Sequence, residues 1–433
     1  MKICVLGLWH LGSVTAACMA AAGHDVTGID PDELTVRQLG QGKAPLFEPG
    51  LEDLLAQGLA AGRLRFSTQA NAAQDAQLLW VTCDTPVDED DRADVESVIA
   101  QVESVLPVLP AGATVLVSSQ LPLGSVARLE QSARRLCLAS GLHFAASPEN
   151  LRLGKALDVF RRPDRIVVGA RDDAARDCVA GALSPLEARI EWMSVESAEM
   201  TKHAINAFLA TSVVFANELA ALCEVLGADA KEVERGLKTE SRIGPGAYVS
   251  PGGAFAGGTL ARDVQFLNQF GQAHGLDNAL LASIRQSNDQ HKKWATRRLH
   301  ELLGSVDGKV IAIWGLTYKP GTDTLRRSMS VELCNQLLVQ GAMLQVHDPA
   351  VVQLPAAWAA KVTRCDTPQA ALEGAAALVV ATQWPDYRTI EPTTIEGLSP
   401  GLVVLDANRF MPAWQTVPGV RYAGVGTPLE MAS

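Results

Sequence analysis

A lysine and an asparagine stand four residues apart in a stretch that predicts one long helix. Lys202 and Asn206 belong to an amphipathic pattern over 194–226 that has no internal glycine or proline. Positions i and i+4 share one helix face, about 6 Å apart at Cβ. At a pocket, such a pair polarises an alcohol or a water and stabilises developing negative charge. On a solvated helix face it would do no chemistry, so the spacing alone leaves both interpretations open.

A second candidate site lies near the start of the chain, where residues 7–12 read GLWHLG. Gly7 follows an apolar strand pattern and makes a tight turn, and Gly12 permits close packing of the next helix. Trp9 replaces the middle glycine of a dinucleotide fingerprint, so the motif alone is compatible with a purely structural turn. Asp30 ends the following strand, where an acid accepts from ribose hydroxyls and repels a 2′-phosphate. The context therefore favours NAD over NADP, with the pyrophosphate at the helix N-terminus.

The elements that must position these residues alternate between strand and helix. The patterns predict strands over 2–6, 24–29, 76–82, 114–118, 309–314, 343–346, 378–381 and 403–405, and helices over 11–22, 95–105, 194–226, 263–273, 278–302 and 329–340. Such alternation at both ends of the chain favours doubly wound parallel sheets. We predict an α/β fold with two Rossmann-like domains, joined by a long central helix and a helical middle domain. The expected boundaries are 1–193, 194–303 and 304–433.

Composition narrows the class of protein. The chain has 433 residues, 48% hydrophobic and 20% charged, which is typical of a globular protein with two or three domains. A net charge of -11 without a basic stripe argues against nucleic-acid binding. The eight cysteines lack the spacing of a metal site, and buried reduced thiols are expected. No signal peptide or run of about 18 uncharged apolar residues is evident, so we expect a cytoplasmic protein without a membrane span.

Several segments resemble motifs of the UDP-glucose/GDP-mannose dehydrogenase family, and they occur in that family's order. Residues 199–211 resemble its central-helix motif, and residues 147–156, SPENLRLGKA, resemble its NPEFLREGxA. Residues 315–328, GLTYKPGTDTLRRS, resemble its GLAFKPNTDDVRES. The resemblance implies an NAD-dependent oxidation of a primary alcohol on a nucleotide-linked sugar, in polysaccharide biosynthesis. It also implies a homodimer built on the central helix.

The resemblance assigns roles to individual residues. The implied catalytic residues are Lys202, Asn206, Asp263 and Glu149. The cofactor-binding residues implied by the turn and by the strand ends are Gly7, Leu11, Gly12, Asp30, Thr85 and Gln120. The implied substrate-binding residues are Glu149, Leu151, Arg152, Lys202, Arg242, Gly257, Lys319 and Arg409. Of these, Arg242 would reach the substrate of the neighbouring subunit, and backbone amides after Gly315 would hold a diphosphate.

One loop departs from the family pattern in a way that affects the chemistry. Residues 251–263 read PGGAFAGGTLARD, and the corresponding family loop usually reads GFGGSCFPKD. We expect Leu260 at the place of the nucleophilic cysteine, which holds the aldehyde as a thiohemiacetal. Leu153 replaces a second acid, and Gln120 replaces a threonine that helps to hold a water. These changes predict a reaction that stops at the aldehyde. The alternatives are four-electron oxidation without a thiol, a non-sugar phosphorylated substrate, or a silent nucleotide-sugar-binding protein.

Overall fold

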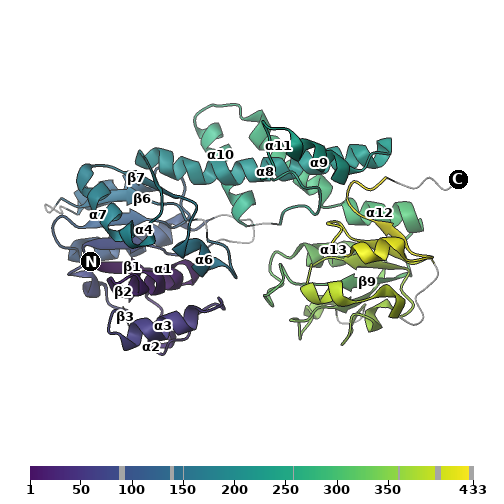
Figure 1. The fold of residues 1–433 in the computed structure, drawn as a ribbon, viewed down its shortest axis with the longest axis horizontal. Helices are drawn as coiled ribbons and strands as arrows, with labels where there is room; N and C mark the ends of the chain where they lie inside the picture. Colours follow the sequence, from purple (N-terminus) through teal and green to yellow (C-terminus); the bar gives the residue numbers. More distant parts are fainter. Residues whose placement is uncertain are drawn as a thin grey trace. The chain divides into compact units, whose positions relative to one another are not determined.

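The computed structural model describes residues 1–86, 93–136, 141–149, 151–256, 258–358, 361–394 and 401–428. The chain divides into two compact units, Met1–Ile205 and Asn206–Ser433. Each unit is an α/β structure, as the alternating pattern predicted (Figure 1). The boundary between the units falls inside the helix α8, Val195–Leu226.

The first unit is built on one mixed sheet with the strand order β3-β2-β1-β4-β5-β6-β7-β8. Neighbouring strands are parallel except β6 and β7, which pair antiparallel. The strands are β1 Lys2–Leu6, β2 Asp25–Ile29, β3 Leu64–Ser67, β4 Leu78–Val81, β5 Thr114–Val117, β6 His143–Ala146, β7 Ile166–Ala170 and β8 Ile190–Met193. The helices are α1 His10–Ala21, α2 Glu33–Gly40, α3 Leu51–Ala60, α4 Val95–Val105, α5 Ser125–Arg135, α6 Ala156–Arg161 and α7 Asp173–Leu183.

Apolar side chains on both faces of this sheet explain why its strands read as continuous hydrophobic runs. Along β4, Leu79 and Val81 join one core cluster, and Leu78 and Trp80 join the other. This two-residue alternation is the pleat of a strand. Helices α4 and α5 cover the first face, and α1, α3, α6 and α7 cover the second. The described cysteines are free thiols, as expected, and burial raises the pKa of Cys4 to about 12.

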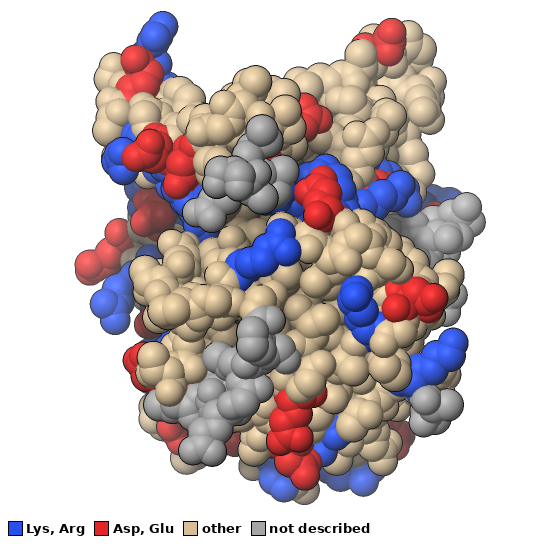
Figure 2. All heavy atoms as spheres, turned by 90° about the vertical axis from the view of Figure 1, so that its right-hand side faces the viewer, with Lys and Arg blue, Asp and Glu red and all other residues tan. Residues whose placement is uncertain are grey.

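The second unit places helices beside a smaller parallel sheet of order β11-β10-β9-β12-β13-β14. Its strands are β9 Val310–Trp314, β10 Met343–His347, β11 Val362–Arg364, β12 Ala377–Val380, β13 Val403–Leu405 and β14 Arg421–Ala423. Its helices are α9 Ala230–Thr239, α10 Thr259–Ala273, α11 Ala279–His291, α12 Trp294–Leu303 and α13 Met329–Val339, with the second half of α8. On the face shown in Figure 2, charged side chains of both signs lie interspersed among other residues.

Helix α8 is, among the described residues, the one helix long and apolar enough to cross a membrane by length and composition. The core helix of a soluble protein passes the same test. In the second unit, α8 contributes Ala207, Ala210 and Val214 to an apolar cluster with Val264 of α10 and Ile284 of α11. Its composition is therefore explained in part by packing against neighbouring helices.

Candidate functional site

Glycine is required at two positions of the first turn. Gly7 has φ +89°, and a Cβ built on it would lie 2.4 Å from Cys83 Cα. A Cβ on Gly12 would lie 1.7 Å from the Gly7 carbonyl oxygen. Trp9, in the middle position, directs its side chain outward and is 46% exposed. The turn therefore keeps the close backbone approach of a dinucleotide-binding fingerprint, and the tryptophan does not fill it.

Asp30 lies where the sequence predicted it, directly after β2 and against the turn. Its Oδ2 accepts from Leu8 N at 2.7 Å, and its Oδ1 accepts from Asp32 N at 2.9 Å. The Gly7 N–H donates to Ile29 O at 2.8 Å, which joins the ends of β1 and β2. The carboxylate is thus fixed beside the amides of the turn, at the place where a dinucleotide ribose is recognised.

The ends of β4, β5 and β6 bring several predicted residues together. Thr85 Oγ1 donates to Gln120 O at 2.9 Å. Gln120, Glu149 and Lys202 line one small pocket, and Lys202 Nζ donates to Glu149 O at 2.6 Å. Glu199, one turn before Lys202, accepts from Gly124 N at 2.8 Å. Burial raises the pKa of the Glu199 carboxyl, against the opposing effect of its backbone N–H donors.

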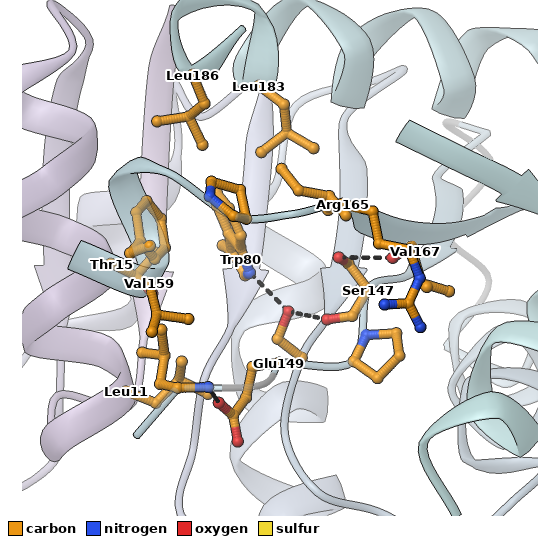
Figure 3. Close-up of a pocket in the computed structure, with 16 residues that line it drawn as sticks. Leu11, Thr15, Trp80, Ser147, Glu149, Val159, Arg165, Val167, Leu183 and Leu186 are labelled. Atoms are coloured by element: carbon orange, nitrogen blue, oxygen red, sulfur yellow. Dashed lines mark hydrogen bonds between the residues drawn. The ribbon is translucent and has the colours of Figure 1, made fainter. Parts of the chain in front are cut away.

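A larger, mostly apolar cavity of about 90 Å³ adjoins the same strand ends (Figure 3). It is lined by Leu11, Glu149 and Leu151 from the predicted site, together with Trp80 and Phe160. Leu151 N donates to Glu149 Oε2 at 2.5 Å, which holds the acid against its own loop. Arg152, in the same loop, is exposed, and Leu153 is half-buried.

Sequence reasoning missed a buried acid that supports this loop. Glu48 is 3% exposed and accepts from His10 Nε2 at 3.0 Å, Gly154 N at 2.8 Å and Ala156 N at 2.7 Å. It therefore ties the first turn of α1 to the loop that carries Glu149. Gly154 and Ala156 are 106 and 108 residues from Glu48 in the sequence, so no local pattern could reveal these contacts.

In the second unit, two of the residues that the resemblance implied, Asn206 and Asp263, are hydrogen-bonded to each other. Asp263 is fully buried, and Asn206 Nδ2 donates to its Oδ2. Asn206 is itself 6% exposed. A buried carboxylate needs such donors, because an uncompensated charge in the interior is strongly unfavourable.

The residue aligned with the family cysteine is Thr259, which corrects the expectation for Leu260. Counted back from Asp263, the loop GFGGSCFPKD places its cysteine at Thr259 and its phenylalanine at Leu260. The packing agrees with this register, since Leu260 contacts the apolar cluster of Ala207 and Val264. Thr259 is the exposed first residue of α10. The expectation was one residue out of register, and a hydroxyl stands where the family has a thiol.

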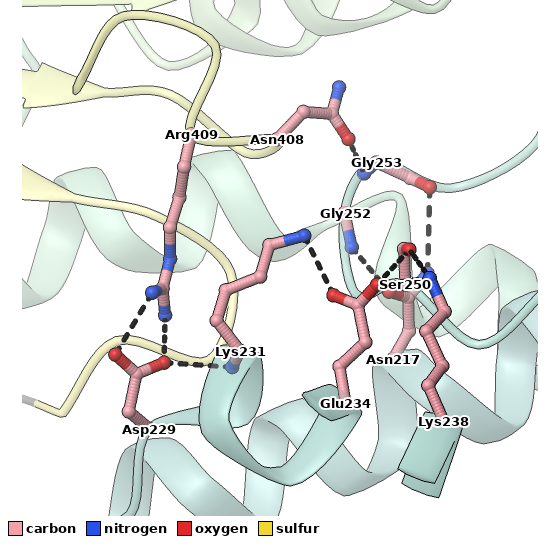
Figure 4. A network of polar contacts seen from close by, with 10 residues as sticks. All are labelled: Asn217, Asp229, Lys231, Glu234, Lys238, Ser250, Gly252, Gly253, Asn408 and Arg409. Atoms are coloured by element: carbon pink, nitrogen blue, oxygen red, sulfur yellow. Dashed lines mark hydrogen bonds and ion pairs between the residues drawn. The ribbon is translucent and has the colours of Figure 1, made fainter. Parts of the chain in front are cut away.

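Side-chain amides hold the glycine-rich loop that precedes α10. Asn217 Oδ1 accepts from Gly252 N at 3.0 Å, and Asn408 Oδ1 accepts from Gly253 N at 2.9 Å (Figure 4). His291 Nε2 donates to Gly252 O at 2.8 Å, and burial lowers the His291 pKa. These residues were absent from the predicted site. Gly257, which was predicted, lies outside the described residues.

The turn after β9 resembles the first turn in its glycine, and a carboxylate accepts from two of its amides. Gly315 has φ +92°, and a Cβ on it would lie 2.4 Å from Thr382 Cβ. Asp348 Oδ2 accepts from Leu316 N at 2.7 Å and from Thr317 N at 3.0 Å. Two of the amides expected to hold a diphosphate, those of Leu316 and Thr317, are thus already bonded to the Asp348 carboxylate. Lys319 instead lines a pocket of about 420 Å³ beside this turn.

Two predicted arginines make contacts outside that pocket. The Arg409 guanidinium pairs with both Asp229 oxygens at 2.7 and 3.0 Å, and the preceding Asn408 lines the pocket (Figure 4). Arg242 is exposed and pairs with Glu240 at 2.9 Å within this chain. The geometry thus ties Arg409 to the start of α9.

The two-glycine turn with its adjacent carboxylate, and the polar strand ends beside it, are typical of a dinucleotide-binding protein. Comparison with known proteins specifies it further. Models of the UDP-glucose/GDP-mannose dehydrogenase family match the NAD binding domain at 1–184, the central domain at 196–290 and the UDP binding domain at 312–413. The chain belongs to the UDP-glucose/GDP-mannose dehydrogenase family.

Individual relatives agree with this assignment. The chain is 35% identical to UDP-glucose 6-dehydrogenase of Pseudomonas aeruginosa, over 99% of this chain and 98% of that protein. It is 31% identical to the enzyme of the same name from Rhizobium meliloti, over 99% and 100%. A solved UDP-glucose dehydrogenase from Pyrobaculum islandicum superposes with a TM-score of 0.86 at 32% identity, covering 98% of this chain and 97% of that one. The protein is an NAD-dependent nucleotide-sugar dehydrogenase that acts on CH–OH donors.

Proposed function

We propose that this protein oxidises the primary alcohol of a UDP-linked hexose by two electrons and releases the aldehyde. Bound NAD⁺ would supply the hydride acceptor; the carbinol carbon would lose a hydride and the hydroxyl a proton to a base, so that alcohol and NAD⁺ would give aldehyde, NADH and H⁺. The observation that carries the proposal is Thr259 at the cysteine position. A threonine hydroxyl is a much weaker nucleophile than a thiolate at neutral pH.

The residues for the first oxidation are present in this chain. Lys202 and Asn206 lie one turn apart on α8, and Asn206 is held by Asp263. We infer that Lys202 and Asn206 polarise the substrate hydroxyl, and that Lys202 with a water near Asp263 removes its proton. Glu149 supports the arrangement through its carbonyl, which accepts from Lys202 Nζ.

The residues for the second oxidation are altered. Besides Thr259, Leu153 supplies no carboxylate for hydrolysis, and Gln120 replaces the threonine that would help to hold a water. We infer that the remaining predicted residues bind the cofactor and the nucleotide. Those for the cofactor are Gly7, Gly12, Asp30 and Thr85, and Lys319 is the one for the nucleotide. We further propose a cytoplasmic protein of polysaccharide biosynthesis, with the three-domain division 1–193, 194–303 and 304–433.

The stoichiometry of NADH tests the proposal. With UDP-glucose as substrate and hydrazine as an aldehyde trap, we expect one NADH per substrate and a trapped aldehyde. Thr259→Cys alone should not yield the acid, because Gln120 and Leu153 still leave the hydrolytic water unassisted. Lys202→Met should abolish NADH formation in both backgrounds. Two NADH per substrate and a carboxylate product from the unaltered protein would refute the aldehyde stop and show that water or Thr259 replaces the thiol.

A further inference from the structure

The residue before α10 adopts a conformation that is open only to glycine. Gly258, the N-cap of α10, has φ +119° and ψ -137°. In the family loop, aligned from Asp263, this position is serine. Because L-residues rarely adopt that backbone conformation, the loop here differs from the family pattern in shape as well as in the residue at Thr259.

Two side chains from the loop after β9 reach this glycine. A Cβ built on Gly258 would lie 3.7 Å from Tyr318 Oη and 4.0 Å from Arg327 Nη1. Tyr318 also lines the 420 Å³ pocket that contains Lys319. Arg327 is half-buried and has φ +61°, the left-handed region that side chains usually avoid. A phenol hydroxyl and a guanidinium therefore flank the residue next to Thr259.

Both residues are departures of this chain from the family motif. Aligned with GLAFKPNTDDVRES, Tyr318 stands for phenylalanine and Arg327 for glutamate. The first change adds a hydrogen-bond donor, and the second reverses the charge. Tyr318, Lys319 and Lys292 line the adjacent pocket, and Lys292 also pairs with Glu332 at 3.2 Å. A guanidinium and a hydroxyl that both lie near the same glycine are suited to anionic oxygen atoms, which accept from both.

We propose that Arg327 and Tyr318 bind an anionic oxygen group of the nucleotide-linked ligand beside Gly258. The inference rests on the proposed function, since it takes the ligand to be a nucleotide sugar. The group is either the diphosphate, which every such ligand carries, or a carboxylate that the sugar already carries, as in a nucleotide-linked uronate. The shared chemistry is a charge-assisted contact that the glutamate and phenylalanine of the family motif do not make.

Calorimetric titration with UDP, UDP-glucose and UDP-glucuronate tests this assignment. We expect Arg327→Glu to weaken binding at least about tenfold and Tyr318→Phe about threefold, as for contacts to charged groups. Arg327→Met removes the cation without adding an acid, and should also weaken binding if the first variant does not fold. Lys361→Glu is the matched control, because Lys361 is exposed and precedes β11, whereas the proposed site follows β9, at the opposite end of the parallel strands.

The pattern across the ligands identifies the group. Equal weakening of all three ligands assigns the diphosphate, and weakening confined to UDP-glucuronate assigns the carboxylate. Affinities within twofold of the unaltered protein for the folded Arg327 variants, or an equal loss in Lys361→Glu, would overturn the inference and leave the proposed function intact. If the unaltered protein binds NAD but none of the three ligands, the proposed function falls together with the inference.

Discussion

At the scale of single residues, the cofactor turn of the first unit combines a steric requirement for glycine with the negative charge of Asp30. Positions 7 and 12 must be glycine, because a Cβ there would lie 2.4 Å and 1.7 Å, respectively, from a backbone atom. Asp30 is held against the turn by Leu8 N. In this fold, an acid at the Asp30 position lies beside the ribose that carries the 2′-phosphate in NADP. The carboxylate and the phosphate are both negative and therefore repel each other. We therefore expect the preference for NAD over NADP to depend on the Asp30 side chain.

Substitution of Asp30 tests this at the residue scale. Asp30→Ala should weaken NAD binding about tenfold and reduce the preference over NADP, since both the ribose acceptor and the repulsion are lost. Fluorescence titration with each dinucleotide measures both effects. Asp25→Ala, an exposed residue at the other end of β2, should leave both affinities unchanged. Tighter binding of NADP than of NAD by the unaltered protein would contradict the assignment.

At the scale of elements, helix α9 is tied to the loop before α10 through one carboxylate. Glu234 accepts from Lys238 Nζ at 2.7 Å, Lys231 Nζ at 2.9 Å and Ser250 Oγ (Figure 4). Burial raises the pKa of Glu234, but these donors outweigh it and lower the pKa to about 2. The folded state thus binds this proton less readily than the unfolded chain. The stabilisation is present above the usual glutamate pKa and is lost as pH falls toward 2.

Acid denaturation of a neutral variant tests the role of this carboxylate. Glu234→Gln should lower the free energy of unfolding at pH 7 by up to about 3 kcal/mol, with the difference shrinking between about pH 4.5 and pH 2. Urea unfolding at pH 7 and pH 3 measures both values. Glu232→Gln, on the same helix but 68% exposed and 3.4 Å from Arg235, should change little at either pH. Equal losses in the two variants would show that Glu234 makes no special contribution.

At the scale of the whole molecule, the two units contain similar glycine turns after their first strands, but the amides of these turns have different partners. Gly7 packs against Cys83 as Gly315 packs against Thr382, and an acid follows the second strand in each lobe. Asp30 takes one turn amide, whereas the Asp348 Oδ2 atom takes two and also accepts from Trp384 Nε1 at 3.1 Å. Two amides of the second turn are therefore bonded to its own carboxylate, and we expect side chains such as Lys319 to contribute to anion binding there.

Helix α8 also bears on the assembly. Phe208, Phe215 and Leu222 recur every seven residues and are 69%, 47% and 57% exposed. An apolar seam at that spacing is typical of helix-to-helix association. We predict a homodimer through this seam, and Phe215→Glu should shift it to monomer in sedimentation at micromolar concentration. Val339→Glu, an 89% exposed apolar position of α13, should remain dimeric. A monomeric unaltered protein would refute the prediction.

The sequence by itself determined the elements and the class of fold. Strand β1 and helix α4 occupy the predicted residues 2–6 and 95–105, and α8 begins one residue after its predicted start. These elements follow from hydrophobic periodicity and from breakers, which act over a few residues. The NAD-binding turn could also be predicted from neighbouring residues, because Gly7 and Gly12 lie within one strand–turn–helix motif.

Only the tertiary structure decided which polar groups are available. Glu48 holds a loop more than a hundred residues away, and Asp348 accepts from two of the amides expected to bind phosphate. Arg409 turns to Asp229, and Asn408 takes the place in the pocket. Each buried donor or acceptor must find a partner, and when that partner comes from a distant part of the chain, no local pattern specifies it.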